Sequence, residues 1–282
     1  MRDLALAWIE LLRLRLALTG ALYTLVGAYL TTGTNGLASA GVVNAACVVA
    51  VVIAFGNAIN DWVDASADAI AKPHRPIPSS RISRRTAGVA TMALAVAALA
   101  AASRLRWELA VFVTCTVLVS AAYSMWLKGI PFAGHGSVGL LCGSILIYGG
   151  LAAGALTAAG WAAATMTFLY VFAQEVLFAI DEEAGDRASQ VATTVTRLGR
   201  ANGVRLYLLL TGALVLVSLW PWAAGFATDR YLVALIPLTV VPTIGMAWAV
   251  SRGFDSNNTV ETCAWCSRFV WYSSIVCILL LR

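Results

Sequence analysis

Charged residues are scarce in this sequence. Only 12% of its 282 residues are charged and 60% are hydrophobic, with a mean hydropathy of +0.82. A soluble domain carries about 25% charged residues. The shortage of charge therefore excludes an ordinary water-soluble protein and predicts an integral membrane protein that is embedded for nearly its whole length.

The sequence also lacks the short motifs of several common protein classes. It has no P-loop, no glycine-rich dinucleotide fingerprint and no nucleophile elbow, so nucleotide-binding and α/β-hydrolase functions have no support. Its halves show no convincing similarity, which argues against a transporter built from internal repeats. No small-residue cleavage site ends the first apolar run, so we expect that run to be a retained helix and not a signal peptide.

The six cysteines do not form a convincing metal site. Cys263 and Cys266 make a lone C-x-x-C pair, whereas a zinc site needs a second pair of ligands. His74 and His135 are poorly placed to supply that pair. Buried thiols that act as small hydrophobic residues are the favoured interpretation, with a metal-binding pair as the alternative.

The net charge of +5 does not indicate a nucleic-acid partner, and none is expected. The 17 arginines and 2 lysines lie mostly between apolar segments, as the positive-inside rule leads one to expect of a membrane protein. The excess of Arg over Lys and the abundant Ala favour a GC-rich bacterial genome. The expected location is therefore a bacterial cytoplasmic membrane, in contact with membrane lipid.

Nine apolar segments are long enough to cross a bilayer, which takes about 20 residues of helix. They cover about 14–32, 40–60, 86–103, 108–127, 136–156, 161–180, 204–222, 231–250 and 264–281. With this count, fifteen Lys and Arg residues fall on the side of the N-terminus and four on the other. The asymmetry predicts one all-α transmembrane domain over residues 1–282, with its N-terminus in the cytoplasm.

Eight of the fourteen acidic residues gather in two clusters, at the cytoplasmic ends of the second and sixth expected helices. The first cluster contains Asp61, Asp64 and Asp68. The second contains Glu175, Asp181, Glu182, Glu183 and Asp186. In the first, spacings of three and four residues place amide and carboxylate oxygens on one helix face, which also includes Asn57 and Asn60. Pro73, Pro76 and Pro78 then end the helix.

Two acidic faces at one membrane surface repel each other unless a cation lies between them. Hard oxygen ligands suit Mg²⁺, which binds through one or two carboxylates and the phosphates of a substrate. Lys72, Arg75 and Lys128 could meet the remaining phosphate oxygens, while the apolar helices surround a hydrophobic tail. The pattern predicts a site for an isoprenoid diphosphate, and the alternative is a solvated acidic surface.

Four stretches resemble segments of the UbiA-type intramembrane prenyltransferases. NDWVDASAD (60–68) with the following KPHRPIPSSRIS is similar to the family's first aspartate-rich signature, N-D-x-x-D-x-x-x-D followed by R-P-x-P-S-G-R-I-S. EVLFAIDEEAGDRASQVATTVTRLG (175–199) resembles the second signature. AYSMWLKGIP (122–131) and RLRLALTGALYTLVGAYL (13–30) resemble further segments. The likeness covers nearly the whole chain, with the segments in the family's order.

The resemblance implies nine transmembrane helices around a central cavity with a cytoplasmic cap. It implies Mg²⁺-dependent transfer of an isoprenyl group from a prenyl diphosphate to a lipophilic acceptor, aromatic or quinone-type. The implied catalytic residues are Asp64, Asp68 and Asp186. The implied metal ligands are Asn60, Asp61, Asp64, Asp68, Glu182 and Asp186. The implied diphosphate-binding residues are Lys72, Arg75, Tyr123 and Lys128, and further candidates are Asn57, Arg13, Glu175 and Asp181.

The sequence departs from the family pattern at four positions. Phe178 and Ala179 replace a common Lys-Asp pair, Glu182 replaces a common Asp, and Leu16 stands where an Asn often follows the arginine of the first helix.

Because Ala179 removes an acid from the second cluster, a terpene cyclase of the same fold, which needs no acceptor, remains a second hypothesis. A transporter or lipid-binding protein is the third, but its polar groups should lie near the membrane midplane. Donor chain length and acceptor identity stay open.

Overall fold

The structure is a computed structural model that describes residues 2–188, 192–253 and 257–282, and in these residues every regular element is helical. The α-helices are α1 (Arg2–Leu11), α2 (Leu14–Thr32), α3 (Ala40–Val63), α4 (Ala65–Ala71), α5 (Arg84–Ala102), α6 (Trp107–Met125), α7 (Ala133–Ala152), α8 (Ala158–Asp181), α9 (Glu183–Ala188), α10 (Thr194–Leu198), α11 (Arg200–Ala223), α12 (Asp229–Leu235), α13 (Val241–Arg252) and α14 (Asn257–Leu279). Three short segments are η1 (Gly33–Gly36), η2 (Leu127–Gly129) and η3 (Ile236–Val240).

Eight helical segments of the described chain are long and apolar enough to cross a membrane. They include α2, α3, α5, α6, α7, α8 and α11, and the continuous stretch Asp229–Arg252 formed by α12, η3 and α13. The ninth expected segment, 264–281, falls on α14, whose apolar stretch Trp265–Leu279 is shorter. The multi-pass, all-α architecture is confirmed, whereas the count of nine spans stays a prediction.

Helix starts follow local capping chemistry. Ser39 accepts a hydrogen bond from the Val42 N–H at the start of α3, and Ser83 does the same for Thr86 at the start of α5. Such side-chain caps satisfy backbone donors that a first helical turn leaves unpaired. The cap at Ser83 explains why α5 begins two residues before the apolar run that predicted it.

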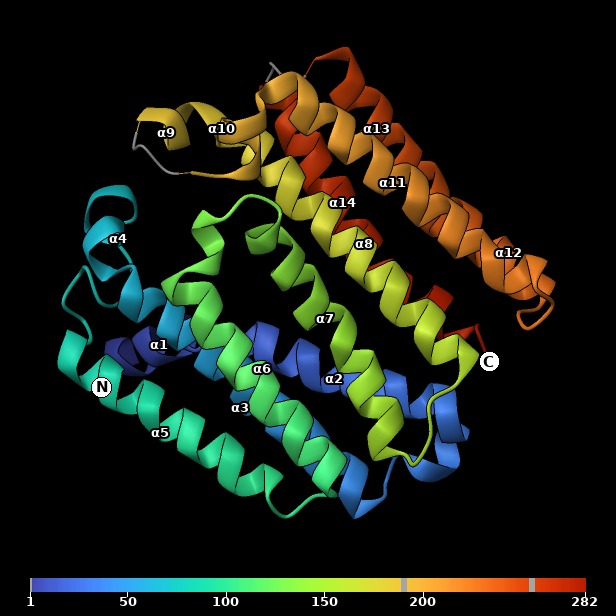
Figure 1. Cartoon of the computed structure of the whole chain (residues 1–282), viewed down its shortest axis with the longest axis horizontal. Coiled ribbons are helices and arrows are strands. Elements are labelled where there is room, and N and C mark those ends of the chain that lie inside the picture. The colour runs from blue at the N-terminus through green and yellow to red at the C-terminus, as the bar shows by residue number, and fades with distance from the viewer. Residues whose placement is uncertain (1, 189–191, 254–256) are drawn as a thin grey trace.

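The long helices form two packed groups that share α2 and α7 (Figure 1). In one group α3 packs against α5 and α6, and a core around Val48, Phe55 and Val113 holds them together. In the other group α8 packs against α7 and α11, around Val176 and Tyr207. This arrangement leaves α2 and α7 in the middle of the molecule, between the two cores.

The helices α2 and α7 approach each other so closely that only glycine fits at two positions. A Cβ atom on Gly27 would lie 2.2 Å from the carbonyl oxygen of Leu146, and one on Gly149 would lie 2.1 Å from that of Thr24. Small residues at such contacts allow the backbones of membrane helices to pack tightly. These glycines therefore set the spacing of the two central helices.

Short elements gather at the end of the bundle where α3 and α8 terminate (Figure 1). They include α4, α9 and α10, as well as α1, which the hydropathy pattern did not predict. Ala7 and Leu11 of α1 are fully buried and belong to a small core with Ile77 and Ile82 of the loop that follows α4. This small core anchors the N-terminal segment beside the first acidic cluster.

The tight contact between α2 and α7 predicts that Gly149→Ala destabilises the protein. The added methyl group would clash with backbone atoms, which cannot move aside by changing rotamer. Overpacking of this kind lowers the free energy of unfolding by about 1–3 kcal/mol. The measurement is the thermal unfolding temperature of the purified protein in detergent. Gly212→Ala on α11 is the matched control, because its Cβ would have no neighbour within 4 Å; equal stability of the two variants would contradict the account.

Candidate functional site

The first acidic cluster lies where α3 passes into α4. Asp64 separates the two helices, yet the hydrogen bonds continue with helical spacing: the Asp64 N–H donates to the Asn60 carbonyl at 2.9 Å and the Asp68 N–H to the Asp64 carbonyl at 2.8 Å. The expected shared face of Asn60, Asp64 and Asp68 is therefore kept across the break. Asp61 and Asp68 are buried, while Asp64 is half-buried.

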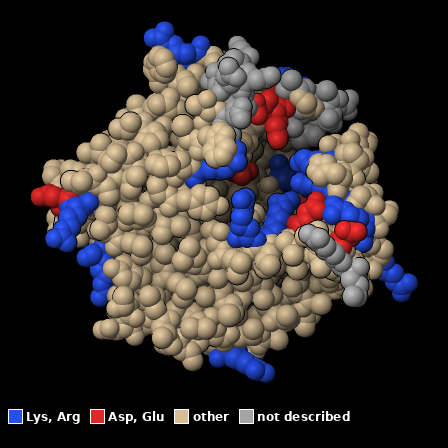
Figure 2. Space-filling model, turned by 180° about the vertical axis from the view of Figure 1, so that it is seen from behind, with Lys and Arg blue, Asp and Glu red and all other residues tan. Residues whose placement is uncertain are grey.

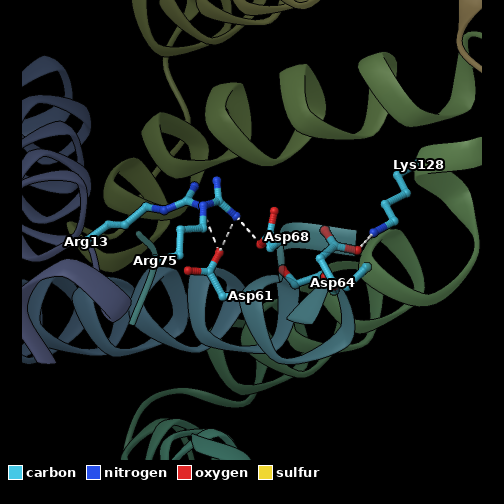
Figure 3. A network of polar contacts seen from close by, with 8 residues as sticks. Arg13, Asp61, Asp64, Asp68, Arg75 and Lys128 are labelled. Atoms are coloured by element: carbon cyan, nitrogen blue, oxygen red, sulfur yellow. Dashed lines mark hydrogen bonds and ion pairs between the residues drawn. The ribbon is translucent and has the colours of Figure 1, made fainter. Parts of the chain in front are cut away.

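Three cations from separate segments pair with these acids (Figure 3). Arg13 Nη2 lies 2.9 Å from Asp61 Oδ1. Arg75 Nη1 bridges two carboxylates, at 3.2 Å from Asp61 Oδ1 and 2.6 Å from Asp68 Oδ2. Lys128 Nζ contacts Asp64 Oδ1. The cluster is thus a network of ion pairs that joins the start of α2, the α3–α4 junction, the following loop and η2 after α6.

The loop after α4 returns over the cluster. The helix ends at Ala71, and the chain then brings Arg75 back to acids up to fourteen positions earlier. Arg81 holds the loop in place, because its guanidinium donates to the His74 carbonyl at 2.6 Å and pairs with Glu10 of α1 at 2.7 Å. The loop and α1 therefore position Arg75.

Arg13 has an unusual backbone conformation. It lies between α1 and α2 with φ +44° and ψ +55°, in the left-handed region that a residue with a side chain adopts only at a cost. This turn lets α1 leave the axis of α2 while the arginine side chain reaches Asp61. The expected participation of Arg13 in the site is consistent with that geometry.

A cavity of about 400 Å³ lies in the middle of the bundle, beside the ion-pair network. Its walls come from α2, α3, α6 and α7, with one residue each from α8 and α14. The surface of the molecule is hollowed where basic and acidic side chains surround an opening (Figure 2). The polar residues that line the cavity at this end are Arg13, Asn57, Asn60, Tyr123 and Glu175.

The cavity changes from polar to apolar along its length. On α3 its lining runs from Asn60 to Val49, and on α6 from Tyr123 to Phe112, a span of twelve residues on each helix, or roughly 16 Å along the helix axis. At the far end the rings of Phe112 and Tyr148 lie 5.2 Å apart. Tyr148 is fully buried, and its hydroxyl has no hydrogen-bond partner among the described residues. A polar mouth therefore leads to an aromatic end.

The second acidic cluster is spread over a wider area. Asp181 and Glu182 are exposed at the end of α8, whereas Glu175, six residues earlier, lines the cavity. Asp186 belongs to α9, and its side chain lies outside the described part of the structure. Among the side chains that are described, no three His, Cys, Asp or Glu residues converge in a way that could hold a metal ion.

The other residues predicted from the sequence have differing positions. Lys72 is exposed at the end of α4 and has no ion pair within the described residues. Phe178 is 48% exposed and Ala179 is buried, and neither lines the cavity. Of the two cysteines in the C-x-x-C pair, Cys263 is buried and Cys266 half-buried.

Two further residues lie at or beside the cavity. His135 of α7, which is not part of the lining, places its Nδ1 atom 3.8 Å from Glu175 Oε2. Trp271 of α14 lies between Tyr23 and Tyr170, with ring centroids 5.1 and 5.7 Å away. Because these rings come from distant parts of the chain, no local motif marks them.

Comparison with known proteins finds relatives that match most of the chain. The model of the UbiA prenyltransferase family matches residues 19–274. A digeranylgeranylglyceryl phosphate synthase of Natronomonas pharaonis is 32% identical over 259 residues, which cover 91% of this chain and 90% of that protein. The protein of the same name from Korarchaeum cryptofilum is 36% identical over 214 residues, covering 76% and 75%. Both relatives are archaeal and give no support to the expected bacterial membrane.

Solved structures share the same fold. One described as "Structural and mechanistic insights into the biosynthesis of Digeranylgeranylglyceryl phosphate synthase in membranes" covers 100% of this chain and 98% of its own, with a TM-score of 0.77 and 21% identity. A UbiA homolog from Archaeoglobus fulgidus bound to GPP and Mg2+ covers 96% and 99%, with a TM-score of 0.72 and 18% identity. At these identities the likeness shows the fold alone.

The bridging position of Arg75 predicts a large loss of stability in Arg75→Gln. Removing its charge leaves Asp68 without its partner and Asp61 with one cation, and breaking a buried ion pair from one side costs about 3–5 kcal/mol. The check is thermal unfolding in detergent without added metal. Arg106→Gln serves as control, because the exposed Arg106–Glu108 pair lies outside the network and is worth about 0–1 kcal/mol. Equal effects in both variants would contradict the assigned role of Arg75.

Proposed function

This chain belongs to the UbiA prenyltransferase family, and we propose that it transfers an isoprenyl group from a prenyl diphosphate to a lipophilic acceptor with the help of Mg²⁺. One observation carries the proposal. A row of amide and carboxylate oxygens, neutralised by three cations, stands at the polar mouth of an otherwise apolar cavity. A charged head with a hydrocarbon tail is the ligand that such a site fits.

The donor set at the α3–α4 junction fits Mg²⁺. Asn60, Asp64 and Asp68 offer hard oxygen ligands on one face, and Mg²⁺ commonly binds through one or two carboxylates, waters and substrate phosphates. A converging group of three acids is therefore not required. When bound, Mg²⁺ would neutralise the diphosphate and make it a better leaving group. Asp61 would assist, and Glu182 and Asp186 are assigned to the opposite wall on the family pattern alone.

The cationic side chains of the site can also bind the phosphate groups of the substrate. Arg75 and Lys128 are paired with the same carboxylates that would face a metal ion. These side chains can exchange carboxylate oxygens for phosphate oxygens, which keeps every buried charge compensated. Tyr123 and Arg13 lie at the same mouth and can add hydrogen bonds. Stabilising the departing diphosphate in this way favours breakage of the allylic carbon–oxygen bond.

The apolar part of the cavity suits the reactive end and the tail of the prenyl group. Aliphatic and aromatic side chains exclude water, which would otherwise capture an allylic cation. Tyr23, Phe112 and Trp271 line the cavity, and aromatic rings can attract positive charge. The residues of this chain thus provide a polar site that binds the diphosphate and an apolar cavity that keeps water from the prenyl tail.

A glyceryl phosphate lipid is the acceptor that we favour. The support is that the two curated relatives are named for a digeranylgeranylglyceryl phosphate product. An aromatic or quinone-type acceptor, expected from the family resemblance, is the alternative. We also propose that the site faces the cytoplasm under a cap of short helices, because the loops at that end carry most of the Lys and Arg residues.

The proposed transfer predicts that product forms only when donor, acceptor and Mg²⁺ are all present. Purified protein in detergent is given geranyl, farnesyl or geranylgeranyl diphosphate, with geranylgeranylglyceryl phosphate or a hydroxybenzoic acid as acceptor, and the organic extract is analysed. EDTA should abolish turnover and Mg²⁺ restore it. A cyclic hydrocarbon or alcohol formed from the donor alone would instead make the protein a terpene cyclase.

Two variants connect this assay to the proposed ligands. Asp64→Asn and Asp68→Asn should lower kcat about 100-fold or more, because each removes a charged oxygen that stabilises the leaving diphosphate. Asp229→Asn at the start of α12 is the control, since that carboxylate accepts from Trp222 at an exposed site away from the cavity. Full activity of either site variant would remove its assignment as a ligand.

A further inference from the structure

Glu175 holds a special position in the cavity. It is the only carboxylate among the side chains that line the cavity in the described part of the structure. It comes from α8, and Asn57 and Asn60 of α3 line the same cavity. The clustered acids of the α3–α4 junction are all neutralised by Arg or Lys, whereas the basic side chain within 4.0 Å of Glu175 is that of His135.

The surroundings of Glu175 leave its oxygens available. Its side chain is 29% exposed, and His135 Nδ1 lies 3.8 Å from Oε2, which is longer than a hydrogen bond. Tyr123 of α6 and Cys142 of α7 lie within electrostatic range of the carboxylate. Nothing described around the group is a fixed donor that would occupy both oxygens, so a ligand in the cavity can reach them.

Prenyl transfer to an oxygen or to a phenol requires removal of a proton. An un-ionised hydroxyl is a weak nucleophile, and a positioned carboxylate can accept its proton as the new bond forms. Such a base must line the chamber in which the acceptor meets the prenyl carbon. Glu175 meets this condition, while the acids at the α3–α4 junction are engaged by cations at the mouth.

We propose that Glu175 is the general base of this protein, an assignment that rests on the proposed prenyl transfer. The allylic carbon–oxygen bond breaks and diphosphate leaves with the electron pair. The acceptor oxygen, or the ring carbon of a phenol, bonds to the prenyl carbon, and the proton it loses passes to the Glu175 carboxylate. His135 acts as a positioning residue that holds the carboxylate toward the cavity.

The assignment predicts that Glu175→Gln loses transfer and keeps donor binding. Gln has the same size but cannot accept the proton, so kcat should fall about 100-fold or more. Mg²⁺-dependent binding of farnesyl thiolodiphosphate, an unreactive donor analogue, should change by less than about twofold, and Glu175→Asp should restore part of kcat. His135→Asn should lower kcat with little change in KM for the acceptor. Glu108→Gln on α6, outside the cavity lining, is the matched control.

Two results would overturn the assignment. Transfer by Glu175→Gln at nearly the wild-type rate would show that another group takes the proton. A loss of donor-analogue binding as large as the loss of transfer would make Glu175 part of the diphosphate site. A wild-type protein that is inactive with every hydroxylated acceptor would overturn the proposed function as well, so the two failures can be told apart.

Discussion

The need to neutralise three acids at the end of an apolar helix organises this structure. The acids are Asp61, Asp64 and Asp68. A buried carboxylate without a partner costs several kcal/mol, and two of the three are buried. Their partners Arg13, Arg75 and Lys128 come from three different segments. The ion pairs therefore fix how the start of α2, the loop after α4 and the segment after α6 meet over α3 (Figure 3).

The same network explains how one site can hold a charged head beside a hydrocarbon tail. The cavity begins at this network and ends between Phe112 and Tyr148. In the resting protein the acids and bases compensate one another, so the mouth is stable without a ligand. On binding, Mg²⁺ would replace the cationic side chains beside the carboxylates, and the diphosphate would replace the carboxylates beside the cationic side chains. The proposed binding is thus an exchange of ion pairs, and no buried charge need be left alone.

Much of this architecture could be predicted from the sequence, because its causes are local. Hydropathy located the long helices, and the spacing of Asn60, Asp64 and Asp68 predicted their common face. The prolines predicted the end of the helix before Arg75. Other features arise from contacts between distant segments, such as the position of His135 beside Glu175. Hydropathy did not predict α1, because its burial depends on the loop after α4. That loop is too far away in the sequence to fall in the same hydropathy window.

The most direct test of the account is a structure of the protein with Mg²⁺ and an unreactive prenyl thiolodiphosphate. We expect Asp64 and Asp68 to lie on the metal, Arg75 and Lys128 to have moved to phosphate oxygens, and the prenyl tail to extend into the cavity toward Phe112. A complex in which the ion pairs of Figure 3 remain intact and the diphosphate binds elsewhere would contradict the exchange on which the proposed function rests.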